Sequence, residues 1–140
     1  MLFRSNNPIA FSRFSYIMGL SLNQDLLSLL DESFSIFVYS DNGKPHFGLL
    51  LSLKDASSGV ESIKKQEASI PSGFSELLYE NMAVLKNVTF RSGEYNGAPI
   101  RFVNIDAGAN YSFDYSVQGK EWYIGTSKDT LRAILDQKKK

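Results

Sequence analysis

Cysteine is absent from this 140-residue chain, and histidine occurs once, at position 46. Without cysteine the chain can form no disulfide, no thiol nucleophile and no thiolate metal site. A zinc site needs three or four ligands, and His46 has neither histidine nor cysteine to join it. Because His46 follows Pro45 just after a predicted turn, we expect an exposed imidazole with no metal-binding or catalytic role.

A surplus of charge of one sign is also missing, since fifteen Lys and Arg residues balance fifteen Asp and Glu residues. Nucleic-acid binders usually carry a basic surplus, because neutralisation of phosphates dominates their affinity. The one basic run is Lys138-Lys139-Lys140, which is typical of a solvated helix end. We therefore expect no nucleic-acid partner.

Long apolar runs are missing as well, because no stretch approaches the roughly 20 apolar residues of a membrane span. Polar residues and a proline interrupt the start before a signal peptide could form: Arg4, Asn6, Asn7, Pro8 and Arg13. The chain opens directly into folded-looking sequence, so we interpret it as a piece of a longer protein. Any membrane contact would then be made by a segment outside this chain.

What the sequence does contain is enough apolar and aromatic residues, 43% and 13%, for the core of a single domain over residues 1–140. Two β-rich runs flank Asn42-Gly43, a strong hairpin signal. Four more short runs follow, separated by turns that contain glycine: VTFRSGE, APIRFVNI, YSFDYSV and EWYIGT. These patterns predict an α+β fold, with an antiparallel sheet of about six strands built from hairpins and with helices packed on one face.

Helices are predicted at four places, and a further helical turn or two is predicted from Phe74 to Met82. The first lies near residues 8–18, with Asn7 as its cap, Pro8 in its first turn and Gly19 at its end. The second follows a cap at Ser21 or Asn23, and the third follows Asp55 or Ser57. The last carries the apolar residues Leu131, Ile134 and Leu135.

The segment GTSKDT, residues 125–130, precedes this last helix and has two interpretations. A phosphate-binding loop needs two glycines, then lysine and a hydroxyl residue, after a parallel strand. Here Gly125 stands alone and the preceding strand comes from a hairpin. Thr126 or Ser127 is a good N-cap, and Asp129 complements the helix dipole. The segment therefore predicts a helix cap.

The residues before this helix also resemble an earlier part of the chain. Residues 34–63 and 111–135 each read as strand, Gly-Lys turn, strand, Lys-Asp and helix. Such units recur widely, so the similarity indicates at most a weak internal repeat.

The string GLSLNQDLLSLLDESFSIFVY resembles a segment in a family of uncharacterised bacterial proteins, a domain of unknown function. LLLSLKDASSGVESI, the turn Tyr95-Asn96-Gly97 and the closing WYIGTSKDTLRAIL extend the resemblance over roughly residues 17 to 137. One departure is Asp31-Glu32-Ser33, where the family has a turn of small residues. The resemblance implies a place outside the cytoplasm, behind a single N-terminal membrane span, and it carries no catalytic residues to this chain.

Carboxylates give no catalytic pair that the sequence can place. Most stand at helix ends or turns, where capping is expected: Asp31, Glu32, Asp41, Glu94 and Asp106. Asp114 lies within a strand, and alternation puts it on one face with Ser112 and Ser116. We interpret this as a wet face, with Asp114 solvated. No serine stands in a Gly-x-Ser-x-Gly motif, so we expect no enzyme activity and no cofactor.

Alternation in the first hairpin places Phe34, Ile36 and Val38 on one face. Four residues then fall on the opposite face of the sheet and form a candidate partner surface: Phe37, Tyr39, Leu50 and Tyr123. The alternative is that a helix, such as 8–18, covers these residues and makes them core.

We therefore expect a non-catalytic interaction or scaffold domain that binds an unknown protein or a second copy of itself. The alternative is a carrier that holds a small apolar ligand between sheet and helices, which requires a cavity of a few hundred Å³.

Overall fold

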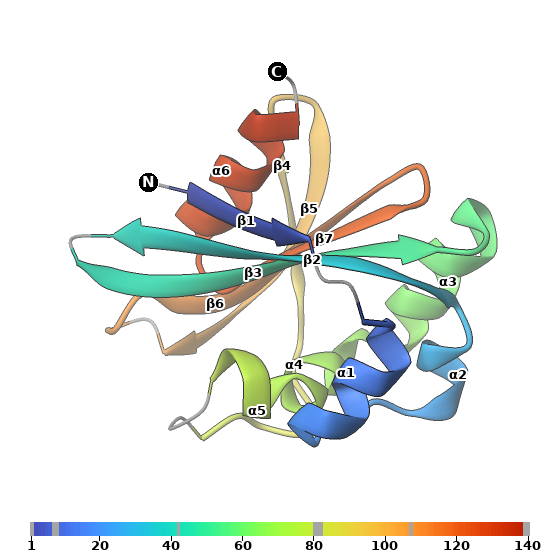
Figure 1. Cartoon of the computed structure of the whole chain (residues 1–140). Helices are drawn as coiled ribbons and strands as arrows, with labels where there is room; N and C mark the ends of the chain where they lie inside the picture. The colour runs from blue at the N-terminus through green and yellow to red at the C-terminus, as the bar shows by residue number, and fades with distance from the viewer. Residues whose placement is uncertain (1, 7–8, 42, 80–82, 107, 139–140) are drawn as a thin grey trace.

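Hairpin-forming sequences do build one antiparallel sheet. The structure, a computed structural model, describes residues 2–6, 9–41, 43–79, 83–106 and 108–138. Within these ranges the sheet has seven strands in the spatial order β1-β2-β3-β7-β6-β5-β4 (Figure 1). The strands are β1 (Leu2–Asn6), β2 (Leu30–Asp41), β3 (Lys44–Leu53), β4 (Arg91–Tyr95), β5 (Ala98–Asp106), β6 (Tyr111–Gln118) and β7 (Glu121–Gly125). The predicted α+β class is confirmed, and β1 is an edge strand in addition to the six that the sequence predicts.

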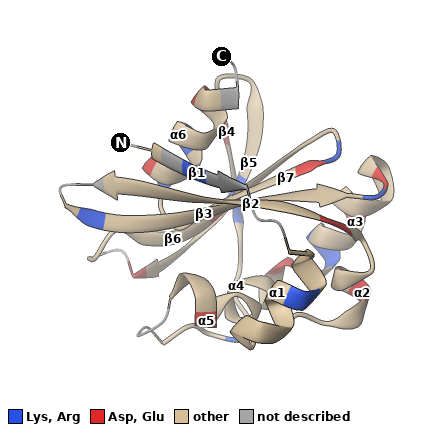
Figure 2. Ribbon diagram, viewed as in Figure 1, with Lys and Arg blue, Asp and Glu red and all other residues tan. Residues whose placement is uncertain are grey.

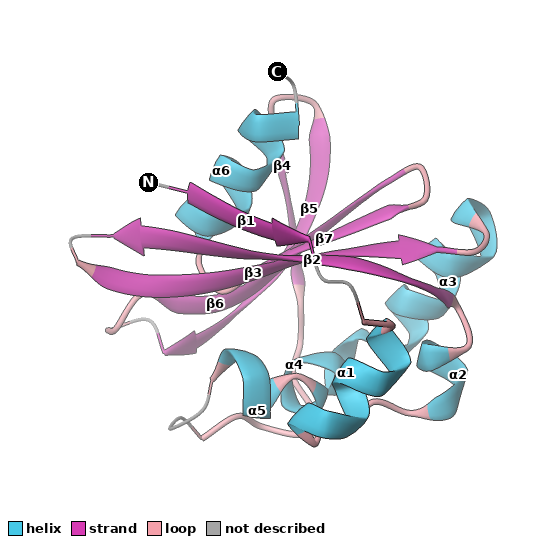
Figure 3. Cartoon of the chain, in the orientation of Figure 1, coloured by secondary structure: helices cyan, strands magenta, loops and turns pink. Residues whose placement is uncertain are grey.

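Helices lie on both faces of this sheet, and not on one face as the sequence analysis expected (Figures 1 and 3). Short helices cover one face: α1 (Phe11–Met18), α2 (Gln24–Leu27), α3 (Ala56–Gln66), the 3-10 turn η1 (Glu67–Ser69), α4 (Ile70–Gly73) and α5 (Ser75–Leu78). The other face is covered by α6 (Lys128–Lys138). The physical reason is that both faces of β2, β3 and β7 carry large apolar side chains.

The larger core lies between the sheet and α1–α5. It contains Phe34 of β2 and the odd-numbered leucines of β3, as alternation predicts, together with Trp122 and Ile124 of β7. Phe11, Leu26 and Ile63 bring the helices onto this face. Edge-to-face aromatic contacts link the layers, such as Phe74 with Trp122 at 6.2 Å between ring centroids.

The smaller core lies beneath α6, and it contains most of the predicted partner surface. Phe37, Leu50 and Tyr123 expose only 2%, 8% and 2% of their area, and Tyr39 is half-buried. The three buried residues, Phe37, Leu50 and Tyr123, pack with Leu131, Ile134 and Leu135 of α6. The expectation that this face is exposed is therefore wrong. A helix covers it, as the alternative proposed, but the helix is α6 and not α1.

Two facing glycines let α6 approach the sheet closely. Gly48 of β3 is paired with Gly125 of β7. A Cβ atom on Gly125 would lie 2.7 Å from the backbone nitrogen of Leu131, and one on Gly48 would lie 2.5 Å from Cδ1 of Ile134. A side chain at Gly125 would meet the backbone of α6, and one at Gly48 would meet the Ile134 side chain, so the two glycines permit the close approach of the helix.

Local signals placed most turns and caps correctly. The side chains of Asn23 and Asp55 accept hydrogen bonds from the N–H groups of Leu26 and Ser58, which caps α2 and α3. Gly19 ends α1 at φ 68°, and the β4–β5 turn has positive φ at both Asn96 and Gly97. The predicted start of the first helix at Asn7-Pro8 is wrong, because α1 begins at Phe11 with Ala10 as its N-cap and without a side-chain cap. Several other predictions fall on positions outside the described residues: Asn42, Lys139, Lys140 and the side chains of Asp41 and Lys138.

The two similar segments fold as β2–β3–α3 and β6–β7–α6, each a hairpin followed by a helix. Their inner strands β3 and β7 pair at the centre of the sheet. However, Ile63 of α3 belongs to the larger core, whereas α6 covers the opposite face. The two units therefore share an order of elements without sharing an arrangement.

Candidate functional site

The segment GTSKDT caps α6, as the sequence predicts. The Ser127 hydroxyl accepts a hydrogen bond from the N–H of Thr130 at 3.1 Å, and the hydroxyls of these two residues lie 2.6 Å apart. Both side chains are buried. Because the Ser127 side chain is occupied in this way, we interpret its role as structural. The next residue, Lys128, lines a cleft.

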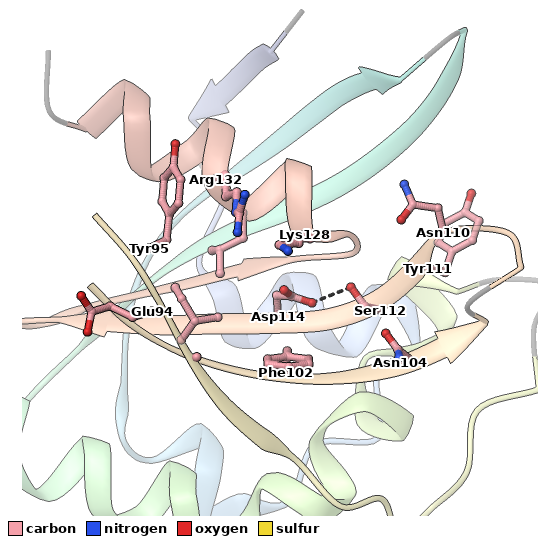
Figure 4. Close-up of a pocket in the computed structure, with 13 residues that line it drawn as sticks. Glu94, Tyr95, Phe102, Asn104, Asn110, Tyr111, Ser112, Asp114, Lys128 and Arg132 are labelled. Atoms are coloured by element: carbon pink, nitrogen blue, oxygen red, sulfur yellow. Dashed lines mark hydrogen bonds between the residues drawn. The ribbon is translucent and has the colours of Figure 1, made fainter. Parts of the chain in front are cut away.

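This cleft, called the α6 cleft below, has a volume of about 400 Å³. It lies between α6 and the β4–β5–β6 side of the sheet (Figure 4). Its lining combines charged, amide, hydroxyl and aromatic groups with apolar ones: Gly93, Glu94, Tyr95, Ile100, Phe102, Asn104, Asn110, Tyr111, Ser112, Asp114, Lys128, Leu131 and Arg132. Its volume lies within the range that the carrier hypothesis requires.

Asp114 lies in this cleft. The sequence predicts a solvated carboxylate at this position, and this prediction is wrong. Alternation does place it with Ser112 on one face of β6, but that face is the one beneath α6, and Asp114 is only 4% exposed. The Ser112 hydroxyl donates a hydrogen bond to Asp114 Oδ1 at 2.5 Å. Figure 4 shows this pair between α6 and the Phe102 ring.

The pKa of Asp114 is raised to about 6. Burial is the largest cause, because it disfavours the charged form. The Ser112 hydrogen bond and the positive charges of Lys128 and Arg132 act in the opposite direction and only partly offset burial. A carboxylate whose pKa is raised in this way, inside a cleft, is the strongest candidate for a functional residue in this protein.

Two cations of α6 form the opposite wall. Lys128 and Arg132 are four residues apart and therefore lie on the same face of the helix. The Arg132 guanidinium lies 4.7 Å from the centroid of the Tyr95 ring. The Tyr95 hydroxyl donates to the carboxylate of Asp136, one turn further along α6, at 2.9 Å. Tyr95 thus restrains Arg132 beside the cleft.

The rest of the cleft supplies an apolar surface with two amides. Ile100, Phe102 and Asn104 alternate along β5 and face α6, and Leu131 projects from the helix. Asn110 and Tyr111 close one end (Figure 4). A cleft of this composition can hold an apolar body and hydrogen-bond a polar group at the same time.

Tyr79, at the end of α5, supports the site from behind. Its buried hydroxyl donates to the backbone oxygen of Ser112 at 2.5 Å. Burial, and secondarily the charge of Asp114, raises the pKa of Tyr79, so the phenol stays protonated as a donor. This contact joins the two layers of the protein at the strand that carries Ser112 and Asp114.

His46 is buried, with 1% of its area exposed, so the expectation of an exposed imidazole is wrong. Its ring lies 4.6 Å from that of Tyr111, and Nδ1 lies 3.5 Å from the Thr126 hydroxyl. His46 belongs to β3, where it pairs with Tyr39, and it is buried because Tyr111 and Thr126, which lie far from it in the sequence, pack against it. Among the described residues, no three His, Asp or Glu side chains gather as a metal site would require.

Sequence reasoning missed one polar cluster on the other face. Arg101 of β5 forms a bidentate ion pair with Glu67 of η1, which also accepts a hydrogen bond from the Tyr115 hydroxyl at 2.7 Å. Burial is the largest influence on the pKa of Glu67 and raises it. The hydrogen bonds from Arg101 and Tyr115, together with the positive charges of Arg101 and Lys64, outweigh burial, so the pKa lies below its usual value. The available signal was a charged residue, Arg101, on the apolar face of β5.

A second cleft of about 490 Å³ lies among the short helices. Serines, apolar residues and the side chains of Gln66 and Lys86 line it. Gln66 Oε1 is buried there without a hydrogen-bond partner in the described part of the chain. This cleft has no buried charged group, and we regard it as the weaker candidate.

Charged residues of both signs are scattered along the ribbon of the sheet and the helices, as Figure 2 shows. Within the described ranges, no helix has the length and apolar character needed to cross a membrane. Comparison of the chain with protein-family models, with curated proteins and with solved structures gave no match.

Proposed function

We propose that this protein is a non-catalytic domain that binds a small molecule in the α6 cleft. The observation that carries the proposal is Asp114, a buried carboxylate with a raised pKa inside a cleft of about 400 Å³. An apolar residue would be more stable at a buried position of the sheet, so the carboxylate is best explained by a ligand. This develops the carrier hypothesis, with a ligand that has polar groups as well as an apolar body.

The proposal is tested by measuring the mass of the native protein and by blocking the cleft with a substitution. Native mass spectrometry of the purified protein is expected to show a mass excess of a few hundred daltons that is lost on denaturation. Gly93→Val is expected to fill the cleft, because the new side chain would lie on the same face of the sheet as the Phe102 side chain. Its Cβ would lie 3.4 Å from the Phe102 ring. Ser40→Val, on the exposed end of β2, is the matched control.

A bare mass is followed by NMR titration with a library of small acids, amines, zwitterions and neutral heterocycles. The proposal expects some compound to shift the backbone signals of Ser112, Lys128 and Leu131 in the wild type and in Ser40→Val, but not in Gly93→Val. If no compound of any charge class shifts these signals, the proposed function is wrong.

An interaction domain is the second candidate, and one observation favours it. Tyr16 and Ile17, consecutive residues at the end of α1, expose 88% and 60% of their area. An exposed apolar pair of this kind is typical of a partner surface. Native spectra that show a dimer in the wild type and a monomer in Tyr16→Ser would support this function, and a monomer at all concentrations would remove self-association.

A further inference from the structure

One buried carboxylate and two cations that line the α6 cleft are separated and not paired with one another. Asp114 lies on β6, while Lys128 and Arg132 lie on α6, and both cations influence Asp114 electrostatically. However, none of these three groups forms an ion pair within 4 Å with another described residue. The ion pair among the described residues joins Arg101 and Glu67, on the other face of the sheet. The carboxylate and the two cations therefore face the same space from opposite walls.

The Asp114 carboxylate is also incompletely hydrogen-bonded. Ser112 donates to Oδ1, and no other described residue donates a hydrogen bond to this carboxylate. Asp114 lines the α6 cleft, so a donor on a ligand can reach its second carboxylate oxygen, Oδ2.

From this arrangement we propose that the ligand is a small zwitterion with an apolar body, of the chemical class of a free aromatic or branched-chain amino acid. Its ammonium group would donate to Asp114, and its acid group would pair with Lys128 and Arg132. This inference rests on the binding function proposed above and names the ligand class for the same cleft.

Each part of such a ligand has a matching group in the cleft. Arginine binds carboxylates with two parallel hydrogen bonds, and Tyr95 restrains the Arg132 guanidinium by stacking on it. The apolar body would lie against Ile100, Phe102 and Leu131. The tether from Tyr95 to Asp136 keeps this wall in place before a ligand arrives.

Selectivity follows from the penalty for leaving one wall unpaired. An acid without an ammonium group would bring negative charge toward Asp114 and satisfy only the cations. An amine without an acid group would satisfy Asp114 and repel Lys128 and Arg132. Because one mismatch brings like charges together at Asp114 and the other brings them together at the two cations, the zwitterion is favoured over both.

The experiment uses three probes with one body: phenylalanine, 3-phenylpropanoate and 2-phenylethylamine. Each is titrated into the full chain at neutral pH and followed by isothermal calorimetry and by the NMR signals of Ser112, Lys128 and Leu131. We expect phenylalanine to bind about tenfold more tightly than either single-charge probe, or better. The series is repeated with leucine, 4-methylpentanoate and 3-methylbutylamine, so that the result does not depend on an aromatic ring.

Variants assign the two ends of the ligand. Asp114→Asn should weaken phenylalanine about tenfold while 3-phenylpropanoate binds as well or better. Arg132→Met and Lys128→Met should weaken phenylalanine and 3-phenylpropanoate and leave 2-phenylethylamine unchanged or improved. Lys120→Met, in the exposed β6–β7 turn, is the control and should bind like the wild type.

The outcomes separate this inference from the function beneath it. If acid and zwitterion bind equally, or if Asp114→Asn changes nothing, the zwitterion class is wrong. If neither zwitterion binds but another compound of the library shifts the cleft signals, the inference fails and the binding function stands. If no compound binds, both fail.

Discussion

Asp114 influences the free energy of unfolding through its protonation. Its pKa rises from the ordinary 3.8 to about 6 on folding, chiefly because of burial. Between these two values the folded state holds a proton that the unfolded state has released. The free energy of unfolding therefore decreases as the pH rises through this range, and the full decrease is reached above about pH 6.

Replacing Asp114 with asparagine removes this loss. We expect Asp114→Asn to be more stable than the wild type at pH 7 by up to about 3 kcal/mol, and the difference to vanish near pH 3. Urea unfolding at several pH values, followed by the fluorescence of the single buried tryptophan, Trp122, measures it. Asp129→Asn, on the exposed first turn of α6, is the control and should gain no stability. A gain of Asp114→Asn that is independent of pH would contradict the explanation.

For single residues, the sequence predicted which face of a strand a side chain lies on better than it predicted whether that side chain is buried. Period-two alternation placed Asp114 with Ser112, and Phe37 with Tyr39, on the correct faces of their strands. It could not show that these faces lie beneath α6, because the covering residues come from the end of the chain. The same limit explains His46, whose contacts with Thr126 and Tyr111 join residues far apart in the sequence.

Among the elements, α6 packs closely on the sheet, where two glycines make room for it and Ser127 caps it. Gly125→Ala would place Cβ 2.7 Å from the backbone nitrogen of Leu131, where no flexible side chain can yield. We expect a loss of about 1–3 kcal/mol in the free energy of unfolding, measured by urea unfolding. Gly93→Ala is the matched control, since this strand glycine faces open space apart from the Phe102 ring, and its stability should change little.

The same variant separates stability from site geometry. Since α6 carries Lys128 and Arg132, a shift of the helix moves one wall of the cleft relative to Asp114. We expect Gly125→Ala to weaken ligand binding even under conditions where the protein is fully folded. Unchanged affinity would show that α6 does not move.

Element types were largely predictable, whereas their packing was not. The apolar spacing of Leu131, Ile134 and Leu135 identified a helix, and Ser127 was one of two caps foreseen. Nothing in that spacing says which face of a sheet the helix meets. The information lies in Gly48 and Gly125, and their role is visible only once β3 and β7 are known to be neighbours.

For the whole molecule, the sheet order predicts a gradient of stability. The central strands β3 and β7 have helices on both faces, whereas β1 and β4 are edges and β4 is largely exposed. Amide hydrogen exchange should therefore be slowest at Leu49, Leu51 and Ile124 and fastest along β4. Hydrogen-exchange mass spectrometry measures this, and equal protection across the sheet would contradict it.

The hairpins β2–β3, β4–β5 and β6–β7 follow from local turn chemistry at glycines, and the sequence predicted them. The pairing of β3 with β7 unites the two halves of the sheet, and no local signal specifies it. This long-range pairing brings Leu49 opposite Ile124 and Leu51 opposite Trp122. Many other pairs of strands could offer apolar partners of this kind, so the sequence does not specify which strands pair.

This central pairing also has a consequence during synthesis on the ribosome. β3 is complete at Leu53, but its partner β7 begins only at Glu121. At ordinary translation speeds, β3 must wait on the order of seconds with one edge unpaired. During that interval the apolar run Leu49–Leu53 is an open template for other strands. Nascent chains that stop before residue 121 are therefore expected to bind holdase chaperones, and those that include α6 are expected to be released.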